Sequence, residues 1–391
     1  MTIGTDQDLP AAARAVAELA SDEMHRAEAE GKLTYPVIDA IRDRGLLRIW
    51  IPRSLGGEEM DVVPSLDVIE TLSYGDPSAG WVVFAGGLIG ATTAAYCGPE
   101  CVDALFAPGE PLPWISGHGT RPGTAVPAGD GWTLSGSWSF GSGLLHATHT
   151  HNLAIVEGTG EARIFVTPVS DAHLLRDSWD VLGLRATGSI DYTIDGAFVP
   201  RDWSHAAGQT SSERGGLLYN LGIIGFVTLG HAAWALGLGR RMLDELIGLV
   251  EAKAGRAGAQ AEDPAFLEGF QVAEGRLRSA RALVHETWGD VAASFAAGDE
   301  MTVRQQTLAR LALVNATFSV HEVAQFAYLA GGTAPLKTGT VIQKLFRDVH
   351  AGTQHISSGP IMRRNTGLGL LGHVADDRVW AFAEMVPSSA V

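Results

Sequence analysis

Cysteine is almost absent from this sequence of 391 residues, which contains only Cys97 and Cys101. On a helix, their i, i+4 spacing holds the two side chains too far apart for easy disulfide formation. We therefore expect two free thiols, which suit a reducing compartment. The sequence also lacks the basic start and the small-residue cleavage site of a signal peptide, so we expect a cytoplasmic protein.

Basic residues are scarce as well, because 28 Lys and Arg stand against 44 Asp and Glu, for a formal net charge of -16. Such a surface repels a phosphate backbone or an anionic lipid surface. We therefore expect no nucleic-acid partner and no membrane partner. Charge is missing altogether from residues 77–99 and 215–239. Glycine and threonine interrupt both runs, and the second also contains Asn220 and His231, so we expect buried helices rather than transmembrane spans.

Two kinds of ligand site are also missing. No G-x-G-x-x-G or P-loop lies at a strand-to-helix turn, so no nicotinamide site is expected. His146, His149 and His151 form an H-x-x-H-x-H pattern that superficially suggests a metal site. No cysteine or acidic ligand follows until Glu157, and we predict no metal here.

Hydrophobic patterning divides the chain into three parts and indicates an α+β protein. Residues 1–110 have the 3.6-residue spacing of helices, and residues 111–210 form short alternating segments broken by turns. Residues 211–391 return to long helical patterns. We expect an N-terminal helical domain, a central antiparallel β domain and a C-terminal four-helix bundle. The four bundle helices are predicted at residues 217–252, 264–297, 301–329 and 338–349.

Three stretches in this order resemble the acyl-CoA dehydrogenase superfamily. They are RDRGLLRIWIPRSLGGEEMDVVPSLDVIETLSYGDPSAGW, SWDVLGLRATGSIDYTIDGAFVP and YLAGGTAPLKTGTVIQKLFRDVHAGTQHI. The resemblance covers nearly the whole chain. It implies an acyl-CoA dehydrogenase-like fold, a flavin between the β domain and the bundle, and a homo-oligomer, a tetramer or at least a dimer.

One departure from that family bears on the reaction. Many of its dehydrogenases carry a glutamate base immediately before a Gly-Thr, but here Ala351 precedes Gly352 and Thr353. Proton abstraction next to a thioester needs a positioned carboxylate, which a methyl group cannot replace. A dehydrogenase with a relocated base, Glu245 or Glu251, stays open as an alternative.

Two further patterns resemble the flavin monooxygenase branch of the superfamily, the oxygenase components of two-component hydroxylases. They are GSWSFGSGLLHATH and an Arg-Asp-x-x-Ala-x-x-x-His motif that starts at Arg347 and ends at His355. The resemblance implies reduced FAD or FMN from a separate flavin reductase, and molecular oxygen as co-substrate. It implies hydroxylation of a small phenol- or indole-like aromatic through a flavin C4a-hydroperoxide. An N- or S-oxygenase and a flavin-free binding protein are alternatives.

The same motifs nominate three catalytic residues. His355 would accept a proton from the substrate or polarise it by hydrogen bonding. Ser142 would hydrogen-bond the N5 edge of the flavin, and His146 would support the flavin. The alternatives are a helix-start histidine for His355 and an ordinary turn serine for Ser142.

Further residues are nominated as flavin contacts. Trp138 would shield one flavin face, although a strand tryptophan is more often part of the core. Arg185, Thr187 and Ser189 would line the flavin or the substrate entrance, or else form an exposed bulge. Gly331 and Gly332 would let the flavin pyrophosphate approach backbone amides, or else form a helix C-cap. Lys253 or Arg256 could pair with a phosphate, which leaves the choice between FAD and FMN open.

Overall fold

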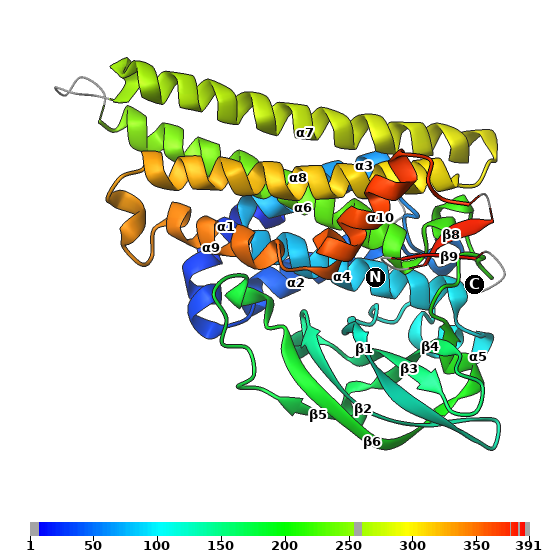
Figure 1. Ribbon diagram of the computed structural model, residues 1–391. Coiled ribbons are helices and arrows are strands. Elements are labelled where there is room, and N and C mark those ends of the chain that lie inside the picture. The colour runs from blue at the N-terminus through cyan, green and yellow to red at the C-terminus, as the bar shows by residue number, and fades with distance from the viewer. Residues whose placement is uncertain (1–7, 254–259, 376, 382–383, 388–391) are drawn as a thin grey trace.

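A computed structural model describes residues 8–253, 260–375, 377–381 and 384–387. The helices form one layer and a seven-stranded sheet forms another beneath it (Figure 1). This arrangement confirms the predicted α+β fold with a helical start, a central sheet and a helical end. Arg256, one of the two nominated phosphate partners, lies outside the described residues.

The first part of the chain consists of five helices, each starting at a recognisable signal. They are α1 (Leu9–Glu30), α2 (Tyr35–Asp43), α3 (Val62–Gly75), α4 (Pro77–Tyr96) and α5 (Pro99–Leu105). Proline occupies one of the first two positions of α1, α2, α4 and α5, where its missing N–H has no intrahelical partner to lose. Helix α4 is apolar on every side, which predicts burial rather than a solvent-facing stripe.

The two uncharged runs of the sequence lie in helices inside the protein. By length and composition alone, Pro77–Tyr96 and Leu217–Glu251 could cross a membrane. In the structure, 94% and 83% of their most apolar windows are buried. The prediction of buried helices is therefore confirmed for both.

The sheet contains strands in the order β5-β6-β2-β1-β3-β4-β7. Their bounds are Ile115–Ala128 for β1, Gly131–Gly141 for β2, His149–Val156 for β3, Ala162–Pro168 for β4, Ala172–Leu175 for β5, Ile190–Pro200 for β6 and Ser204–Ala206 for β7. One pairing differs from the antiparallel expectation, because β1 and β3 run parallel. After β2 turns back along one edge of β1, the chain crosses to the other edge, so β3 runs in the direction of β1.

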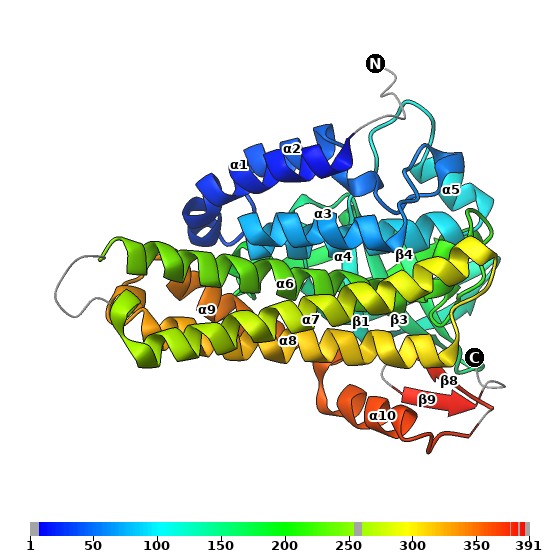
Figure 2. The same cartoon turned by 90° about the horizontal axis from the view of Figure 1, so that it is seen from above.

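The last part of the chain contains the four predicted bundle helices and two elements that the sequence pattern did not reveal. Helices α6 (Gly222–Glu251), α7 (Pro264–Ala297), α8 (Val303–Ala330) and α9 (Val341–Gly352) begin and end close to the predicted positions. Helix α10 (Pro360–Leu370) and the hairpin of β8 (Arg378–Ala381) and β9 (Glu384–Pro387) were not expected. They lie on the opposite side of the bundle from α1 and α2 (Figure 2). Gly367 and Gly369 weaken the helical pattern of α10.

A buried ion triad joins the start of α4 to α9. The Lys344 ammonium lies 2.8 Å from the Asp76 carboxylate and 2.7 Å from the Asp348 carboxylate, and all three side chains are almost completely buried. Burial alone would lower the pKa of Lys344, but the two carboxylates outweigh it and raise that pKa above its usual value. Asp76 also accepts the Ser78 N–H at 3.0 Å and so caps α4.

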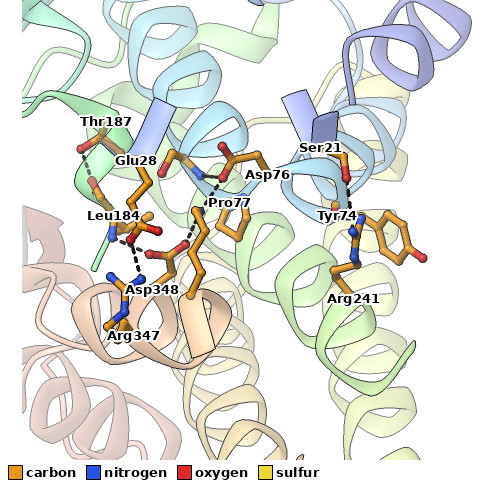
Figure 3. A network of polar contacts seen from close by, with 12 residues as sticks. Ser21, Glu28, Tyr74, Asp76, Pro77, Leu184, Thr187, Arg241, Arg347 and Asp348 are labelled. Atoms are coloured by element: carbon orange, nitrogen blue, oxygen red, sulfur yellow. Dashed lines mark hydrogen bonds and ion pairs between the residues drawn. The ribbon is translucent and has the colours of Figure 1, made fainter. Parts of the chain in front are cut away.

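The same α9 turn holds the loop that precedes β6. Asp348 accepts the Leu184 backbone N–H at 2.6 Å, and Arg347 pairs with Glu28 of α1 (Figure 3). Arg347 also donates to the Leu182 carbonyl at 2.8 Å. Gly183 permits this close approach, because a Cβ there would lie 2.1 Å from the Arg347 carbonyl oxygen. The Arg-Asp pair of the sequence motif is therefore a structural clamp on residues 182–184.

Replacement of Lys344 by methionine will test the triad. Lys344→Met leaves two buried carboxylates without their cation, which should lower the free energy of unfolding by about 3–5 kcal/mol. Urea denaturation measures this change. Lys337→Met, at an exposed position, is the matched control and should stay within about 0.5 kcal/mol of the parent protein. Equal urea midpoints for the two variants would show that the triad contributes nothing.

A buried histidine where the sheet meets α4 makes stability depend on pH. The His205 ring packs edge-on against Tyr96 at a centroid distance of 5.2 Å, and burial lowers the pKa of His205 to about 4. Above pH 6.5 the ring is neutral in both states. As the pH falls from about 6.5 toward 4, only the unfolded chain takes up the proton, so the free energy of unfolding falls by about 1.4 kcal/mol per pH unit.

A pH series of urea denaturations on His205→Gln will measure this contribution. The variant lacks the titrating ring, so its stability should decline less steeply than that of the parent protein between pH 6.5 and 4. Exposed His173→Gln is the control and should keep the parent slope. An unchanged slope in His205→Gln would contradict the assignment.

Candidate active site between the sheet and the bundle

Two cavities meet where the sheet faces α4, α6 and the turn after α9. The first encloses about 970 Å³, its open mouth included, and its walls are mainly apolar. They are built by side chains such as Leu88 and Ile89 of α4 and Ile223, Ile224 and Val227 of α6. The second cavity is lined by Trp179, Leu184, Thr187, Ser189, Ala351 and Gln354. Both cavities share Trp81, Phe140, Ser142, His355 and Ile356.

A chain of hydroxyl groups runs along the second cavity from Ser142. The Ser142 and Ser189 Oγ atoms are 2.8 Å apart, and Ser189 Oγ lies 2.6 Å from Thr187 Oγ1. Thr187 donates its proton to the Leu184 carbonyl at 2.7 Å, so Ser189 donates to Thr187 and Ser142 donates to Ser189. Trp81 completes the chain by donating its indole N–H to Ser142 Oγ at 3.2 Å. The proton of Ser142 is thus committed to Ser189, and its remaining lone pair is an acceptor at the junction of the cavities.

Phe140 stands at the same junction in an unusual backbone conformation. Its φ is 66°, which L-residues rarely adopt, and its side chain is 56% exposed. The ring packs edge-on against Trp179 at 6.1 Å, so the two aromatic rings flank the second cavity. The turn of the Trp-Ser-Phe-Gly-Ser-Gly motif therefore presents both an aromatic ring and the Ser142 hydroxyl to the cavities.

His355 caps the short helical turn Ile356–Ser358 with its own side chain. Its Nδ1 accepts the Ser357 backbone N–H at 3.3 Å and lies 2.6 Å from Ser357 Oγ. An Nδ1 that accepts hydrogen bonds carries no proton, so Nε2 carries the proton of the neutral ring. Toward a molecule in the cavities, neutral His355 is a hydrogen-bond donor. This geometry favours the polarising role over the role of base.

His231 of α6 supports that arrangement from behind. Its Nδ1 lies 3.1 Å from Ser357 Oγ, and because Ser357 donates to His355, His231 must donate to Ser357. Burial, reinforced by neighbouring His355, holds the pKa of His231 well below its usual value. The His231 and His355 rings meet edge to face at 5.2 Å, and the Trp81 ring contacts both. A neutral His231 therefore orients Ser357 and, through it, the His355 ring.

Several of these residues were not found by sequence reasoning. His231 entered only as a polar interruption of an apolar run, and Trp81 and Ser357 were not singled out. His151 was set aside with the metal pattern, yet its ring lines the first cavity. The sequence signal that could have identified Trp81 and His231 is an aromatic or polar residue inside a long uncharged run.

Thr187 and Ser189, two of the residues nominated as flavin contacts, line the second cavity. Arg185 turns away: it donates to the Val181 carbonyl at 3.0 Å and pairs with exposed Asp180. The segment forms a turn of 3-10 helix rather than a simple bulge.

Trp138 and His146 lie outside both cavities. Trp138 is fully buried in the sheet core, stacks on Tyr192 and donates its N–H to the Leu153 carbonyl at 2.9 Å. This position fits the core alternative and does not fit a flavin shield. His146 packs edge-on against Tyr35 at 5.8 Å, and burial, with Lys32 and Arg42 adding to it, lowers the pKa of His146 to about 4. The ring after the motif turn thus points toward α2, away from Ser142.

Gly331 and Gly332 end α8, as in the C-cap alternative, and line neither cavity. Glu245 pairs with Arg241 on α6 at 2.7 Å. Among the described residues that line the two cavities, none is an aspartate or a glutamate. The structure therefore offers no relocated carboxylate base, neither Glu245 nor Glu251, at this site.

The proton position on His355 can be measured directly. In ¹⁵N spectra of histidine-labelled protein, we expect His355 to be protonated at Nε2 and unprotonated at Nδ1, with His355→Gln identifying the signals. Ser357→Ala removes the hydroxyl donor to Nδ1 and leaves only the longer bond from the backbone N–H, so the ring should shift toward a mixture of tautomers. Ser358→Ala is the matched control, because that hydroxyl donates only to the Thr353 and His355 carbonyls. A protonated Nδ1 in the parent protein would contradict the assignment.

Comparison with known families agrees with the geometry. The model for the acyl-CoA dehydrogenase N-terminal domain matches residues 6–108, and the model for the C-terminal domain matches residues 229–360. Indole-3-acetate monooxygenase from Pseudomonas putida is 28% identical over 342 residues, which cover 86% of each chain. The flavin-dependent monooxygenase oxygenase subunit HsaA from Mycobacterium tuberculosis is 25% identical and covers 92% of this chain and 95% of its own.

Solved structures show the same fold. The HsaA monooxygenase from M. tuberculosis superposes with a TM-score of 0.86 at 23% identity, covering 94% of this chain and 97% of its own. XiaF from Streptomyces sp., in complex with FADH2 and glycerol, superposes with a TM-score of 0.84 at 22% identity, covering 93% and 95%. The chain therefore belongs to the acyl-CoA dehydrogenase superfamily, in its branch of flavin-dependent monooxygenases.

Proposed function

We propose that this protein is the oxygenase component of a two-component flavin-dependent monooxygenase that hydroxylates a small, phenol- or indole-like aromatic substrate. The observation that carries the proposal is the junction of two cavities at Ser142 and His355. The first cavity suits a substrate, and the second cavity suits a cofactor ring. Reaction between two bound molecules requires such a shared wall.

The second cavity fits the ring of a flavin. Phe140, Trp179 and Leu184 provide apolar surface, while Ser142, Thr187, Ser189 and Gln354 provide hydrogen-bonding groups. A flavin ring combines apolar faces with polar edges, so this set of groups matches its chemistry. A reduced flavin bound there would supply the electrons that activate molecular oxygen.

The protein's own residues would orient the substrate and exclude water. The Ile and Leu side chains of the first cavity remove water from the reacting centre, which strengthens the few polar contacts that remain. His355 would donate its Nε2 proton in a hydrogen bond to an oxygen atom at the junction. Ser142, held by Trp81 and Ser189, would accept a hydrogen bond from the cofactor edge.

The dehydrogenase alternative lacks its essential group. Ala351 lines the second cavity at the position where many relatives in the superfamily carry glutamate. Among the described lining residues, no other carboxylate takes its place. Oxygenation needs no such base, so the cavity chemistry favours the monooxygenase.

The oligomeric state, the source of the flavin and the location in the cell are proposed as well. We propose a homotetramer, the assembly that the resemblance to the superfamily implies. A separate reductase would deliver FAD or FMN; the relative from Rhizobium sp. is named an FADH(2)-dependent resorcinol hydroxylase oxygenase component. Buried, free Cys97 and Cys101 support a cytoplasmic location.

Oxygen labelling tests the activity. With a flavin reductase, NADH, FAD or FMN and ¹⁸O₂, we expect one ¹⁸O atom in the product of an indole or phenol substrate. A parallel screen with amines and thioethers tests N- and S-oxygenation. If every substrate gives only hydrogen peroxide, the proposal fails.

Ser142→Ala tests the role of the junction. Loss of one hydrogen bond should weaken binding of reduced flavin roughly fivefold and raise the fraction of oxygen lost as hydrogen peroxide. Anaerobic fluorescence titration and a peroxide assay measure the two effects. Ser137→Ala, exposed on the same strand, is the matched control and should behave like the parent protein. Equal binding and equal peroxide yield in both variants would remove Ser142 from the site.

A further inference from the structure

The walls of the first cavity carry no formal charge among the described residues. Its polar groups are limited to Ser142, His151, His355 and Ser357, and no lysine, arginine, aspartate or glutamate lines it. Everything else on the wall is apolar or glycine. A molecule that fills the cavity therefore meets hydrocarbon, aromatic rings and neutral hydrogen-bonding groups.

Ser142 and Ser357 are already engaged with neighbouring groups, and the two buried histidines behind the wall are neutral. The Ser142 proton is directed to Ser189, and Ser357 is held between His355 and His231. His231 lies fully buried behind Ser357, and its depressed pKa keeps the ring neutral. His205, whose ring lies 6.0 Å from that of His151, is kept neutral by burial in the same way. A positive charge is thus disfavoured on the two buried rings directly behind the wall.

The arginines nearest in sequence turn away from the cavity. Ile164 lines it, but Arg163 on the same strand pairs with Glu161 and donates to Ser204. Adjacent residues of a strand face opposite sides of the sheet, which explains the difference. Met362 lines the cavity as well, whereas the Arg363 guanidinium lies over the Phe318 ring at 4.9 Å. Neither guanidinium is placed to pair with a bound anion.

An ionised group on the substrate would lose its hydration in this cavity without gaining a counter-charge. Burial of an unpaired carboxylate is among the largest penalties in protein chemistry, and it amounts to several kcal/mol even after relaxation. A neutral amide or hydroxyl needs only a hydrogen bond, which groups such as the His355 N–H can provide. The wall therefore disfavours a charged group on the substrate much more strongly than a neutral polar group.

We propose that the substrate is an uncharged aromatic molecule, without a carboxylate, sulfonate or ammonium group. The inference rests on the proposed function, because it assumes that the first cavity holds the substrate. It separates this protein from the relatives named for indole-3-acetate, an acid, which match the chain over most of its length. The fold and the reaction type are shared, but the charge of the substrate is not.

Matched ligand pairs that differ only in charge test the proposal. The pairs are indole-3-acetate with indole-3-acetamide, and 4-hydroxyphenylacetate with 4-hydroxyphenylacetamide. Binding to the flavin-free protein at pH 7.5, followed by calorimetry, is the main readout, and product formation by the reconstituted enzyme is the second. We expect each amide to bind at least about 30-fold more tightly than its acid, which corresponds to about 2 kcal/mol.

A charge placed on the wall should reverse the preference. Ile223→Lys introduces an ammonium at a half-buried wall position and should narrow or invert the amide-to-acid ratio. Ile224→Lys is a second variant in case the first fails to fold, as judged by circular dichroism. Val272→Lys, exposed on α7, is the control and should keep the parent ratio.

The outcomes separate this inference from the proposed function. If an acid binds the parent protein as tightly as its amide and is oxygenated, the uncharged-substrate inference is overturned while the monooxygenase assignment stands. If neither member of any pair binds or reacts, both are overturned. Preference for the amides, lost in the Ile223→Lys variant, supports the inference.

Discussion

The ion triad of Asp76, Lys344 and Asp348 is the interaction on which the geometry of the site depends. Asp76 starts α4, and Trp81 follows little more than one helical turn later. Lys344 and Asp348 lie on α9, beyond which the chain continues to His355. Asp348 also holds Leu184, and the hydroxyl chain along the second cavity begins at the Leu184 carbonyl. One buried cation thus fixes the relative positions of three segments that are far apart in sequence.

Two hydrogen-bonded chains converge on Trp81 from opposite directions. From the sheet side come Thr187, Ser189 and Ser142, and from the bundle side the indole ring contacts His231 and His355. Because each hydroxyl has one proton and each chain ends at a defined acceptor, the direction of every donor follows from the geometry. Such a network has few alternative arrangements, which suits a site that must hold a cofactor and a substrate in register.

Sequence patterns predicted the fold well because its main features are local. Apolar spacing marked the long helices, and alternating segments marked the strands. Within the candidate site, Ser142 and His355, which line both cavities, could be nominated from the sequence because they belong to continuous motifs. Trp81 and His231 were missed because their roles arise from tertiary contacts between α4, α6 and the turn after α9. His146 was misplaced because a position in a motif does not reveal in which direction a ring points.

Helix α9 carries residues that hold other segments in its middle and a residue that lines the second cavity near its end. Lys344, Arg347 and Asp348 face the segments that they clamp, whereas Ala351, one turn later, faces the second cavity. Gly352 is required for packing, because a Cβ there would lie 2.1 Å from the Trp234 ring. The residues that keep the scaffold together are therefore distinct from the residue that decides whether a base is present. A substitution at residue 351 therefore changes the wall of the second cavity without removing any contact of the ion triad or of the clamp on residues 182–184.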